Sequence, residues 1–137
     1  MAIPFGIAIP FIELLGCELQ RFGGGQSEVT LAARPEHLNA FAVVHGGVLM
    51  TLMDVTMAAA ARSATDGLGA ITIEMKTSFM RPARAPLRAE GRLLYRTRSM
   101  AFTEGTVFDA DGQACCHATG TFKFVPGWSA TSGVATD

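Results

Sequence analysis

The sequence predicts an α+β domain in which a curved antiparallel β-sheet wraps around one long central α-helix. One segment, residues 45–63, is apolar nearly all round and has the length of a long helix. About six other segments alternate apolar and polar side chains, as half-buried strands do. Because a helix that is apolar on nearly every side has to be covered on most of them, a sheet that curves around it is the arrangement we expect.

The individual elements follow from local patterns. The long helix is predicted from His45 to Ser63 and ends near Asp66-Gly67, a typical stop signal. Before it, residues 11–15 predict a short helical turn and residues 34–42 a loop. The predicted strands cover residues 16–22, 27–33, 70–80, 87–97, 100–109 and 113–125. Two turns are marked by glycine, at residues 23–25 and at Asp111-Gly112.

Length and composition favour one folded domain over residues 1–137. Of the 137 residues, 49% are hydrophobic and 17% are charged, which is enough apolar sequence for a core. The core is expected to span residues 13–125. The segment 126–137 contains Pro, Gly, Ser and Thr and is expected to be a flexible tail.

Charge and hydropathy argue against nucleic-acid and membrane partners. The net charge of -1 gives no general attraction to a polyanion. No apolar run is long enough to span a bilayer without a charge or a proline. The apolar segment 3–15 lacks a basic start and is interrupted by prolines and a glycine, so we expect it to pack on the domain rather than to be a signal peptide.

The three cysteines do not form the pattern of a disulfide framework. Cys115 and Cys116 are adjacent, so on a strand their side chains point to opposite faces. We therefore expect reduced thiols and a cytoplasmic location.

Asp54 is the only charged residue between His45 and Arg62 in the predicted helix. It lies beyond the first turn, so it does not cap the helix or interact with the helix dipole, and burying an unpaired carboxylate is costly. Two interpretations are open at this point. Asp54 lies on a solvated stripe or pairs with a distant arginine, or it is a catalytic base or nucleophile held in apolar surroundings.

Two glycines, Gly46 and Gly47, follow His45 at the predicted helix start. Without Cβ atoms they let a ligand approach the free N–H groups of the first turn. Those groups and the helix dipole suit a carbonyl oxygen that gains negative charge. A tight loop-to-helix turn explains the same residues without a ligand.

The spacing of Gly47 and Asp54 connects the two features. They are seven residues apart and share a helix face, yet a rise of about 1.5 Å per residue separates them by roughly 10 Å along the axis. One carbonyl group does not reach both within one helix. An antiparallel helix from a second subunit would bring its Asp54 to this Gly47, so the site is expected to be shared across a dimer.

The stretch from Asn39 through His45-Gly46-Gly47 to Asp54 resembles the signature of the hotdog-fold acyl-CoA thioesterases. The pattern Asn-x5-His-Gly-Gly-x6-Asp is matched at every defined position. The closer match is the branch typified by phenylacetate-pathway thioesterases and thioesterase superfamily member 2. Many relatives carry a glycine three residues after the asparagine, where this chain has Ala42. The resemblance extends over residues 13–124.

This resemblance implies a hotdog fold and a thioesterase, a hydrolase that converts an aryl- or medium-chain acyl-CoA to a free acid and CoA. Asp54 would act as general base or nucleophile, and the Gly47 N–H would polarise the thioester carbonyl. The residues implied to shape the loop, hold the substrate or assist the water are Asn39, His45 and Thr72. The resemblance also implies a homodimer, commonly doubled to a homotetramer, with no metal and no cofactor besides the CoA of the substrate.

Arginines are concentrated between residues 81 and 98, where six of the eleven basic residues lie. Guanidinium groups bind phosphate well, and CoA carries several phosphate charges. On a regular strand, arginines at even spacing share a face, as the set Arg88, Arg92, Arg96 and Arg98 would. A solvated sheet face also explains that set. With the motif, the residues expected to bind substrate and CoA are Gly46, Phe79, Arg81, Arg96, Arg98 and Ser99.

Two alternative functions stay open at the level of sequence. A hotdog hydratase or dehydratase pairs a histidine with a carboxylate, whereas here Asp54 stands in the thioesterase position. A non-catalytic acyl-CoA binding module is the other alternative. It would bind acyl-CoA without releasing free thiol.

Overall fold

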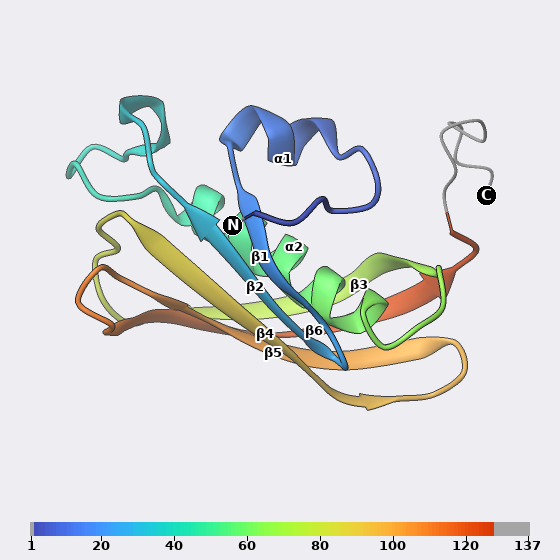
Figure 1. Ribbon diagram of the computed structural model, residues 1–137. Helices are drawn as coiled ribbons and strands as arrows, with labels where there is room; N and C mark the ends of the chain where they lie inside the picture. The colour runs from blue at the N-terminus through green and yellow to red at the C-terminus, as the bar shows by residue number, and fades with distance from the viewer. Residues whose placement is uncertain (1, 128–137) are drawn as a thin grey trace.

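The computed structural model describes residues 2–127, and in it one sheet curls around one long helix (Figure 1). The elements, in chain order, are α1 (Pro10–Leu15), β1 (Glu18–Gly23), β2 (Gln26–Leu31), the 3-10 turn η1 (Pro35–His37), α2 (Gly46–Arg62), β3 (Gly69–Phe79), β4 (Leu87–Arg96), β5 (Met100–Phe108) and β6 (Ala114–Val125). The six strands pair antiparallel in the order β1-β2-β4-β5-β6-β3. The predicted hotdog arrangement is therefore confirmed, with element ends within two residues of those expected from the sequence.

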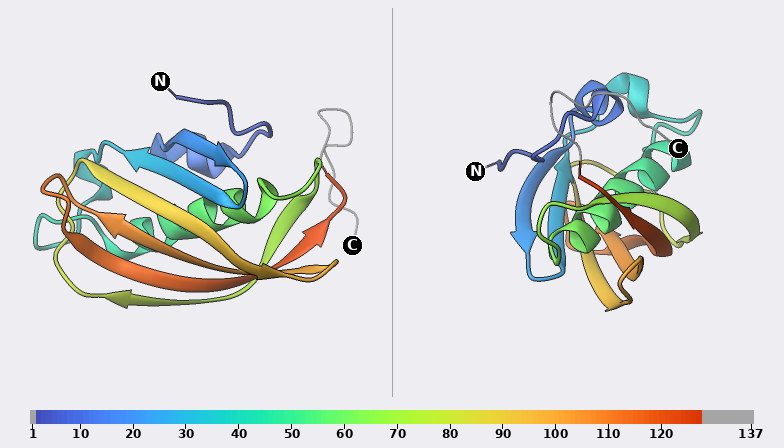
Figure 2. Two further views of the ribbon diagram at one scale, coloured as in Figure 1. Left: turned by 60° about the horizontal axis from the view of Figure 1, so that its bottom comes forward. Right: turned by 90° about the vertical axis from the view of Figure 1, so that its right-hand side faces the viewer.

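Helix α2 lies against the inner face of the sheet and contacts all six strands (Figure 2). Its side chains Leu52, Met53 and Met57 have no exposed surface. Burial of each such side chain stabilises the fold by about 1.5–3 kcal/mol. The inner face of β6 supplies Phe122, which is also fully buried. The core that the sequence predicts from helix apolarity thus lies between α2 and the sheet.

Three glycines on the inner face of the sheet allow α2 to approach closely. A Cβ on Gly91 in β4 would lie 2.7 Å from the Thr56 carbonyl oxygen of α2. A Cβ on Gly105 or on Gly120 would meet the methionine side chains of α2, at 2.2 Å from Met53 and 3.0 Å from Met57. The short distance between helix and sheet therefore depends on these glycines.

One side of the molecule is incompletely covered in the single chain. Strand β3 is an edge of the sheet and pairs only with β6 among the described strands. Its Ile71 and Ile73 are 50% and 55% exposed, and Phe79 at its end is 51% exposed. Apolar side chains on an unpaired edge strand form a surface suited to association with another chain.

The N-terminal segment packs on the domain, as expected. Ile3 forms an isolated bridge with Leu19 of β1, and the Phe5 carbonyl oxygen accepts a hydrogen bond of 2.9 Å from Arg62.

All three cysteines are free. No helix within residues 2–127 has the length and apolarity needed to cross a membrane. Most of the predicted flexible tail, residues 128–137, lies outside the described residues.

Candidate active site

Asp54 lies on the incompletely covered side of α2 and is half-buried. The Thr72 hydroxyl of β3 donates a 2.5 Å hydrogen bond to its Oδ1 atom. Thr72 reaches the helix because it pairs with the buried Phe122 of β6, and residues opposite each other in a sheet point to the same face. Burial raises the pKa of the Asp54 carboxyl, and the hydrogen bond from Thr72 partly offsets that rise.

No cation within residues 2–127 forms an ion pair with Asp54. The interpretation that Asp54 pairs with a distant arginine is therefore not supported in the single chain. Asp54 is a half-buried carboxylate whose hydrogen-bond partner is a neutral hydroxyl. Such a group is available for proton transfer or for attack on a carbon centre.

The first turn of α2 is capped by His45. Its Nδ1 atom accepts a 2.8 Å hydrogen bond from the Gly47 N–H. In a neutral imidazole the proton is then on Nε2. A Cβ on Gly47 would lie 3.2 Å from Nδ1, so the glycine gives the imidazole room to fold over the helix end. The N–H of Gly47, expected to polarise a carbonyl, is therefore already engaged by His45.

The neighbouring Gly46 N–H forms no hydrogen bond with any residue between 2 and 127. It lies in the first turn of α2, where the positive end of the helix dipole adds to its attraction for an anion. Gly46 was expected to contact the substrate. Its N–H is the free donor of the helix end.

Asn39 holds the loop before α2 in shape. Its Oδ1 accepts hydrogen bonds from the backbone N–H of Phe41, at 2.8 Å, and of Val43, at 3.4 Å. Ala42 between them has a φ of 59°. This left-handed conformation favours glycine over alanine. The side chain of Asn39 thus supports a strained alanine directly beside the helix start.

An open cavity of about 380 Å³ lies beside the N-terminal end of α2. The Phe79 ring forms one wall and is 3.5 Å from the position that a Cβ on Gly46 would take. The cavity is mainly apolar and is lined by Asn39, Val43, Val44, Gly46, Leu49, Phe79, Met80, Arg81, Pro82 and Ala83. It therefore brings together three of the predicted residues with the free N–H of the helix end.

Asp54 does not line this cavity. With a rise of about 1.5 Å per residue, roughly 10 Å separate it from Gly47 along the helix axis. Both residues belong to the stripe of α2 that the chain's own sheet leaves partly open, which consists of Gly47, Met50, Thr51, Asp54 and Ala58. Within one chain the carboxylate and the helix end are thus on one face but apart.

The arginines of β4 do not share a face, contrary to the expectation from even spacing. Arg92 pairs with Glu104 on the outer face of the sheet. A bulge between Leu93 and Tyr95 then reverses the alternation, so that Arg96 turns to the inner side. There its guanidinium lies 4.5 Å from the ring centroid of Phe124. The expectation was wrong because an extra residue in one strand flips every later side chain.

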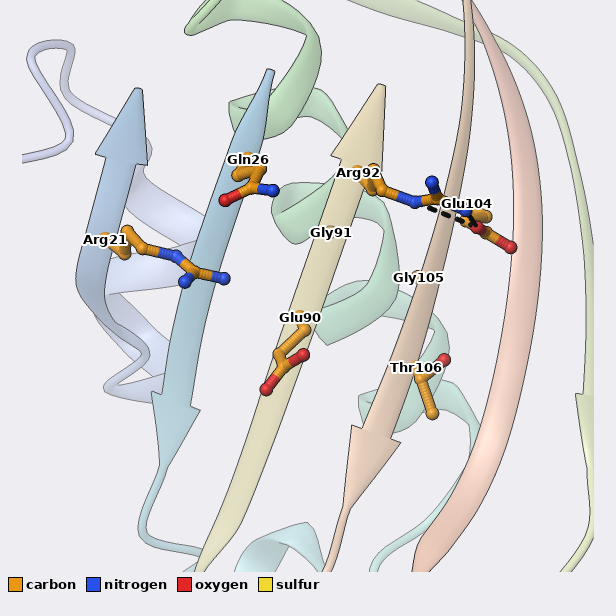
Figure 3. Close-up of a pocket in the computed structure, with 8 residues that line it drawn as sticks. All are labelled: Arg21, Gln26, Glu90, Gly91, Arg92, Glu104, Gly105 and Thr106. Carbon is orange, nitrogen blue, oxygen red and sulfur yellow. Dashed lines mark hydrogen bonds and ion pairs between the residues drawn. The ribbon is translucent and has the colours of Figure 1, made fainter. Parts of the chain in front are cut away.

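The outer-face arginines are neutralised by acids on the same strand, β4, and on its two neighbours, β2 and β5. Arg88 pairs with Glu28 and Glu90. Arg92 pairs with Glu104 (Figure 3). The hydrogen bond from Arg92, followed by that from His117, lowers the pKa of the Glu104 carboxyl. A shallow cavity of about 190 Å³ on this face mixes both charge signs. The solvated-face interpretation therefore fits Arg88 and Arg92 better than phosphate binding.

Arg96, Arg98 and Ser99 lie at the opposite end of α2 from the cavity. Arg96 donates a 3.2 Å hydrogen bond to the Ala64 carbonyl oxygen, just past the C-terminal end of the helix. Arg98 and Ser99 are exposed in the β4–β5 turn. A helix of 17 residues is about 25 Å long. In one chain these three residues are therefore separated from Gly46, Phe79 and Arg81.

Asp109 is a charged residue near the cavity that the sequence interpretation missed. Its carboxylate faces Arg81 from the β5–β6 turn. The sequence around it, Asp-Ala-Asp-Gly, has the composition of a turn, and that composition explains both acids without a site.

The sequence profile of the family described as Thioesterase superfamily matches residues 41–116 of the chain. This stretch contains His45, Asp54, Thr72 and Arg81. It covers more than half of the chain.

The chain is also similar to individual solved structures and relatives. The conserved protein PA5202 from Pseudomonas aeruginosa is 30% identical, with a TM-score of 0.82 over 88% of this chain and 97% of that one. A structure from Ralstonia eutropha JMP134 is 29% identical, with a TM-score of 0.77 over 85% of this chain and 92% of that one. That protein is described as a thioesterase by inference and as related to phenylacetic acid degradation. SSO2140 of Saccharolobus solfataricus, named by inference as an esterase, is 29% identical over 72% of this chain and 71% of that protein.

Proposed function

Because the chain belongs to the Thioesterase superfamily and is a thioester hydrolase, we propose that it hydrolyses an aryl- or medium-chain acyl-CoA to the free acid and CoA. One observation carries the proposal. The Asp54 carboxylate is half-buried, has a raised pKa, and is hydrogen-bonded by Thr72 without a neutralising cation within residues 2–127. A carboxylate in that state is suited to take a proton from water or to attack a thioester.

In the proposed reaction the thioester carbonyl oxygen lies at the first turn of α2. The Gly46 N–H is free to donate to it, and the Gly47 N–H joins when the His45 imidazole releases its hydrogen bond. Asp54 takes a proton from water while the water oxygen bonds to the carbonyl carbon. The C–S bond then breaks, and the proton passes to the departing thiolate. Direct attack by Asp54 would instead give an anhydride that water cleaves.

A second copy of the chain completes the proposed site. The separation of roughly 10 Å between Asp54 and Gly47 requires the two halves of the site to come from different helices. The edge strand β3 and the open stripe of α2 would form the surface to which the second copy binds. A two-fold axis between two β3 strands would run the two α2 helices antiparallel, and two such dimers would form a tetramer.

The same dimer would unite the residues proposed to hold CoA. In antiparallel helices, the C-terminal end of one α2 lies beside the N-terminal end of the other. Arg96, Arg98 and Ser99 of one subunit would then flank the cavity of its partner, where Arg81 lies. Guanidinium groups at that position would meet the phosphates of CoA.

The acyl group is proposed from the shape of the cavity and from one relative. The mainly apolar lining, with Phe79 and Leu49, suits an aryl or medium-chain acyl group. The relation of the Ralstonia eutropha protein to phenylacetic acid degradation supports the aryl-acetyl class.

We propose a cytoplasmic reaction without metal or cofactor. The three free cysteines fit a reducing compartment.

The test is thiol release across a panel of acyl-CoAs, measured on wild type and on Asp54→Asn. We expect the variant to lower kcat by about 10²–10⁴-fold, the usual contribution of a general base. Undiminished turnover in Asp54→Asn would refute the role of the carboxylate. Hydration of crotonyl-CoA without thiol release would identify a hydratase instead, and binding of acyl-CoA with neither reaction would identify a binding module.

The stability of Asp54→Asn serves as its control. Burial raises the pKa of Asp54 in the folded state, so its favourable contribution to stability exists below the unfolded pKa and is lost as pH rises through the folded pKa. At neutral pH the ionised carboxylate is thus unfavourable for folding. The variant is expected to melt no lower than wild type, and lost turnover then reports chemistry.

A further inference from the structure

The β5–β6 turn holds the carboxylate of Asp109 in a fixed position. One oxygen, Oδ1, accepts backbone hydrogen bonds from Asp111, at 2.9 Å, and from Gln113, at 3.0 Å. The side chain is only 10% exposed. Because a buried carboxylate is costly without partners, its second oxygen needs a partner as well.

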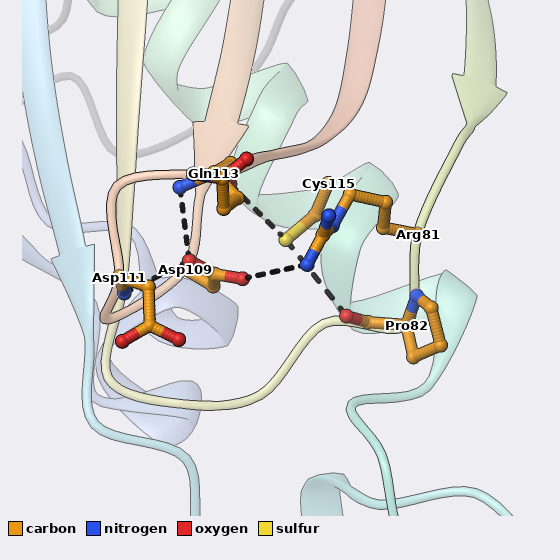
Figure 4. Close-up of polar contacts among 6 residues, drawn as sticks. All are labelled: Arg81, Pro82, Asp109, Asp111, Gln113 and Cys115. Atoms are coloured by element: carbon orange, nitrogen blue, oxygen red, sulfur yellow. Dashed lines mark hydrogen bonds and ion pairs between the residues drawn. The ribbon is translucent and has the colours of Figure 1, made fainter.

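That second oxygen, Oδ2, faces Arg81, with 3.9 Å to Nη2 (Figure 4). The backbone of Arg81 is fixed too, since its N–H donates to the Cys115 carbonyl oxygen at 3.1 Å. The Cys115 thiol lies 3.9 Å from the Pro82 carbonyl oxygen and links the same segment to β6. Both ends of the Arg81 side chain are therefore restrained, by β6 at its backbone and by Asp109 at its guanidinium.

Arg81 keeps most of its hydrogen-bonding capacity. A guanidinium has five N–H donors, and the Asp109 contact involves one nitrogen. The side chain is 53% exposed, and Arg81 is one of the residues that line the cavity with Gly46 and Phe79. Arg81 is therefore an oriented cation with free donors at the edge of the proposed site.

We infer that Asp109 is a positioning residue, which aims the Arg81 guanidinium at an anionic group of the bound thioester. The inference rests on the proposed function, because it assigns the cavity to a thioester. The anionic group has two possible sources with the same chemistry. It is a phosphate on the CoA side or a carboxylate at the far end of the acyl group, and both accept paired hydrogen bonds from a guanidinium.

The experiment compares three variants by their discrimination between charged and uncharged thioesters. Asp109→Asn keeps an oxygen for the two backbone N–H groups of the turn and removes the charge. Arg81→Met removes the cation. Asp111→Asn is the matched control, since it makes the same charge change two residues away on an exposed side chain that points away from Arg81 (Figure 4).

Two substrate pairs identify the source of the anion. The first pair is an acyl-CoA and the corresponding acyl-pantetheine, which lacks the nucleotide phosphates. The second pair is adipyl-CoA and hexanoyl-CoA, six-carbon thioesters that differ in the acyl carboxylate. For each pair the measured quantity is the ratio of kcat/KM values, with KM and kcat determined separately.

We expect Asp109→Asn to lower one of the two ratios by about threefold, mainly through KM, as loss of a partly exposed ion pair would. Arg81→Met is expected to lower the same ratio by about tenfold, as loss of a charge-assisted hydrogen bond would. In the Arg81→Met background, Asp109→Asn should have no further effect on that ratio. Asp111→Asn should leave both ratios as in wild type.

A purely structural role predicts something different. If Asp109 only braces the cavity wall, Asp109→Asn lowers kcat/KM equally for both members of each pair, and the inference is overturned. Unchanged ratios overturn it too. Circular dichroism melting checks folding, and Asp109→Ser, which also caps a turn, replaces Asp109→Asn if that variant does not fold.

Failure of the proposed function has a separate signature, namely no thiol release from any thioester by wild type. In that event the same ligand pairs are compared by calorimetric binding instead of turnover. A loss of discrimination in Kd for Asp109→Asn supports the positioning role without hydrolysis, and equal Kd ratios in all variants overturn it.

Discussion

The hydroxyl of Thr72 and the carboxylate of Asp54 form the contact on which the proposed chemistry depends most closely. They come from different elements, and within residues 2–127 only the hydrogen bond between them opposes the effect of burial on the Asp54 pKa. Asp54 has to be ionised to act as base or nucleophile. The activity is therefore expected to rise with pH through the pKa of Asp54, which burial raises above the ordinary value of an aspartate.

Replacing Thr72 by valine removes the hydrogen bond that lowers the pKa of Asp54. The pKa then rises further, so the acidic limb of the pH profile of kcat/KM should move to higher pH. Thr72→Ser keeps the hydroxyl and is expected to keep the limb where wild type has it. A limb at the same pH in Thr72→Val and wild type would contradict the assignment of that limb to Asp54.

The sequence singled out Asp54 and the helix start as candidates, but it did not indicate how the N–H groups of the first turn are used. A lone acid in an apolar helix and paired glycines after a histidine are visible in the sequence. The hydrogen bond from the Gly47 N–H to His45 depends on the orientation of the imidazole, which no spacing encodes. The free N–H of the turn belongs to Gly46 for this reason.

At the scale of elements, the strand and helix predictions were accurate because periodicity and turn residues are local signals. The bulge in β4 gave no such signal. Leu93, Leu94 and Tyr95 are all typical strand residues, so nothing in the sequence indicates that one of them is unpaired. The direction of Arg96 could therefore be determined only from the fold. Asp109 was not predicted as the partner of Arg81, because its place in a turn already accounts for an aspartate at that position.

Packing of α2 on the sheet leads to a prediction about Gly91. A Cβ there would lie 2.7 Å from the Thr56 carbonyl oxygen, which is backbone and has little freedom to move. Gly91→Ala is therefore expected to destabilise the fold by about 1–3 kcal/mol, the range for overpacking a core. Urea unfolding measures this, with Gly23→Ala as the control, because a Cβ on Gly23 would meet nothing within 4 Å. Equal stability of the two variants would contradict the packing described.

At the scale of the whole molecule, the exposed edge of β3 predicts a dimer that a single charge disrupts. Ile73 is 55% exposed on this strand. Ile73→Lys would bury a charge in the proposed interface, so the variant should elute as a monomer and lose thioesterase activity. Leu94→Lys is the matched control, since Leu94 is 49% exposed in the bulge of β4, away from that edge. A dimeric and active Ile73→Lys protein would exclude this interface.

Sharing of the site between subunits is the central claim, and mixing two inactive variants tests it most directly. Asp54→Asn removes the carboxylate, and Gly46→Val fills the approach to the helix end beside Phe79. If each site uses Asp54 of one subunit and Gly46 of the other, a mixed dimer contains one intact site. Co-refolding equal amounts should then restore about a quarter of wild-type activity, because half of the dimers are mixed and half of their sites are intact. Activity no higher than that of the separate variants would contradict the claim.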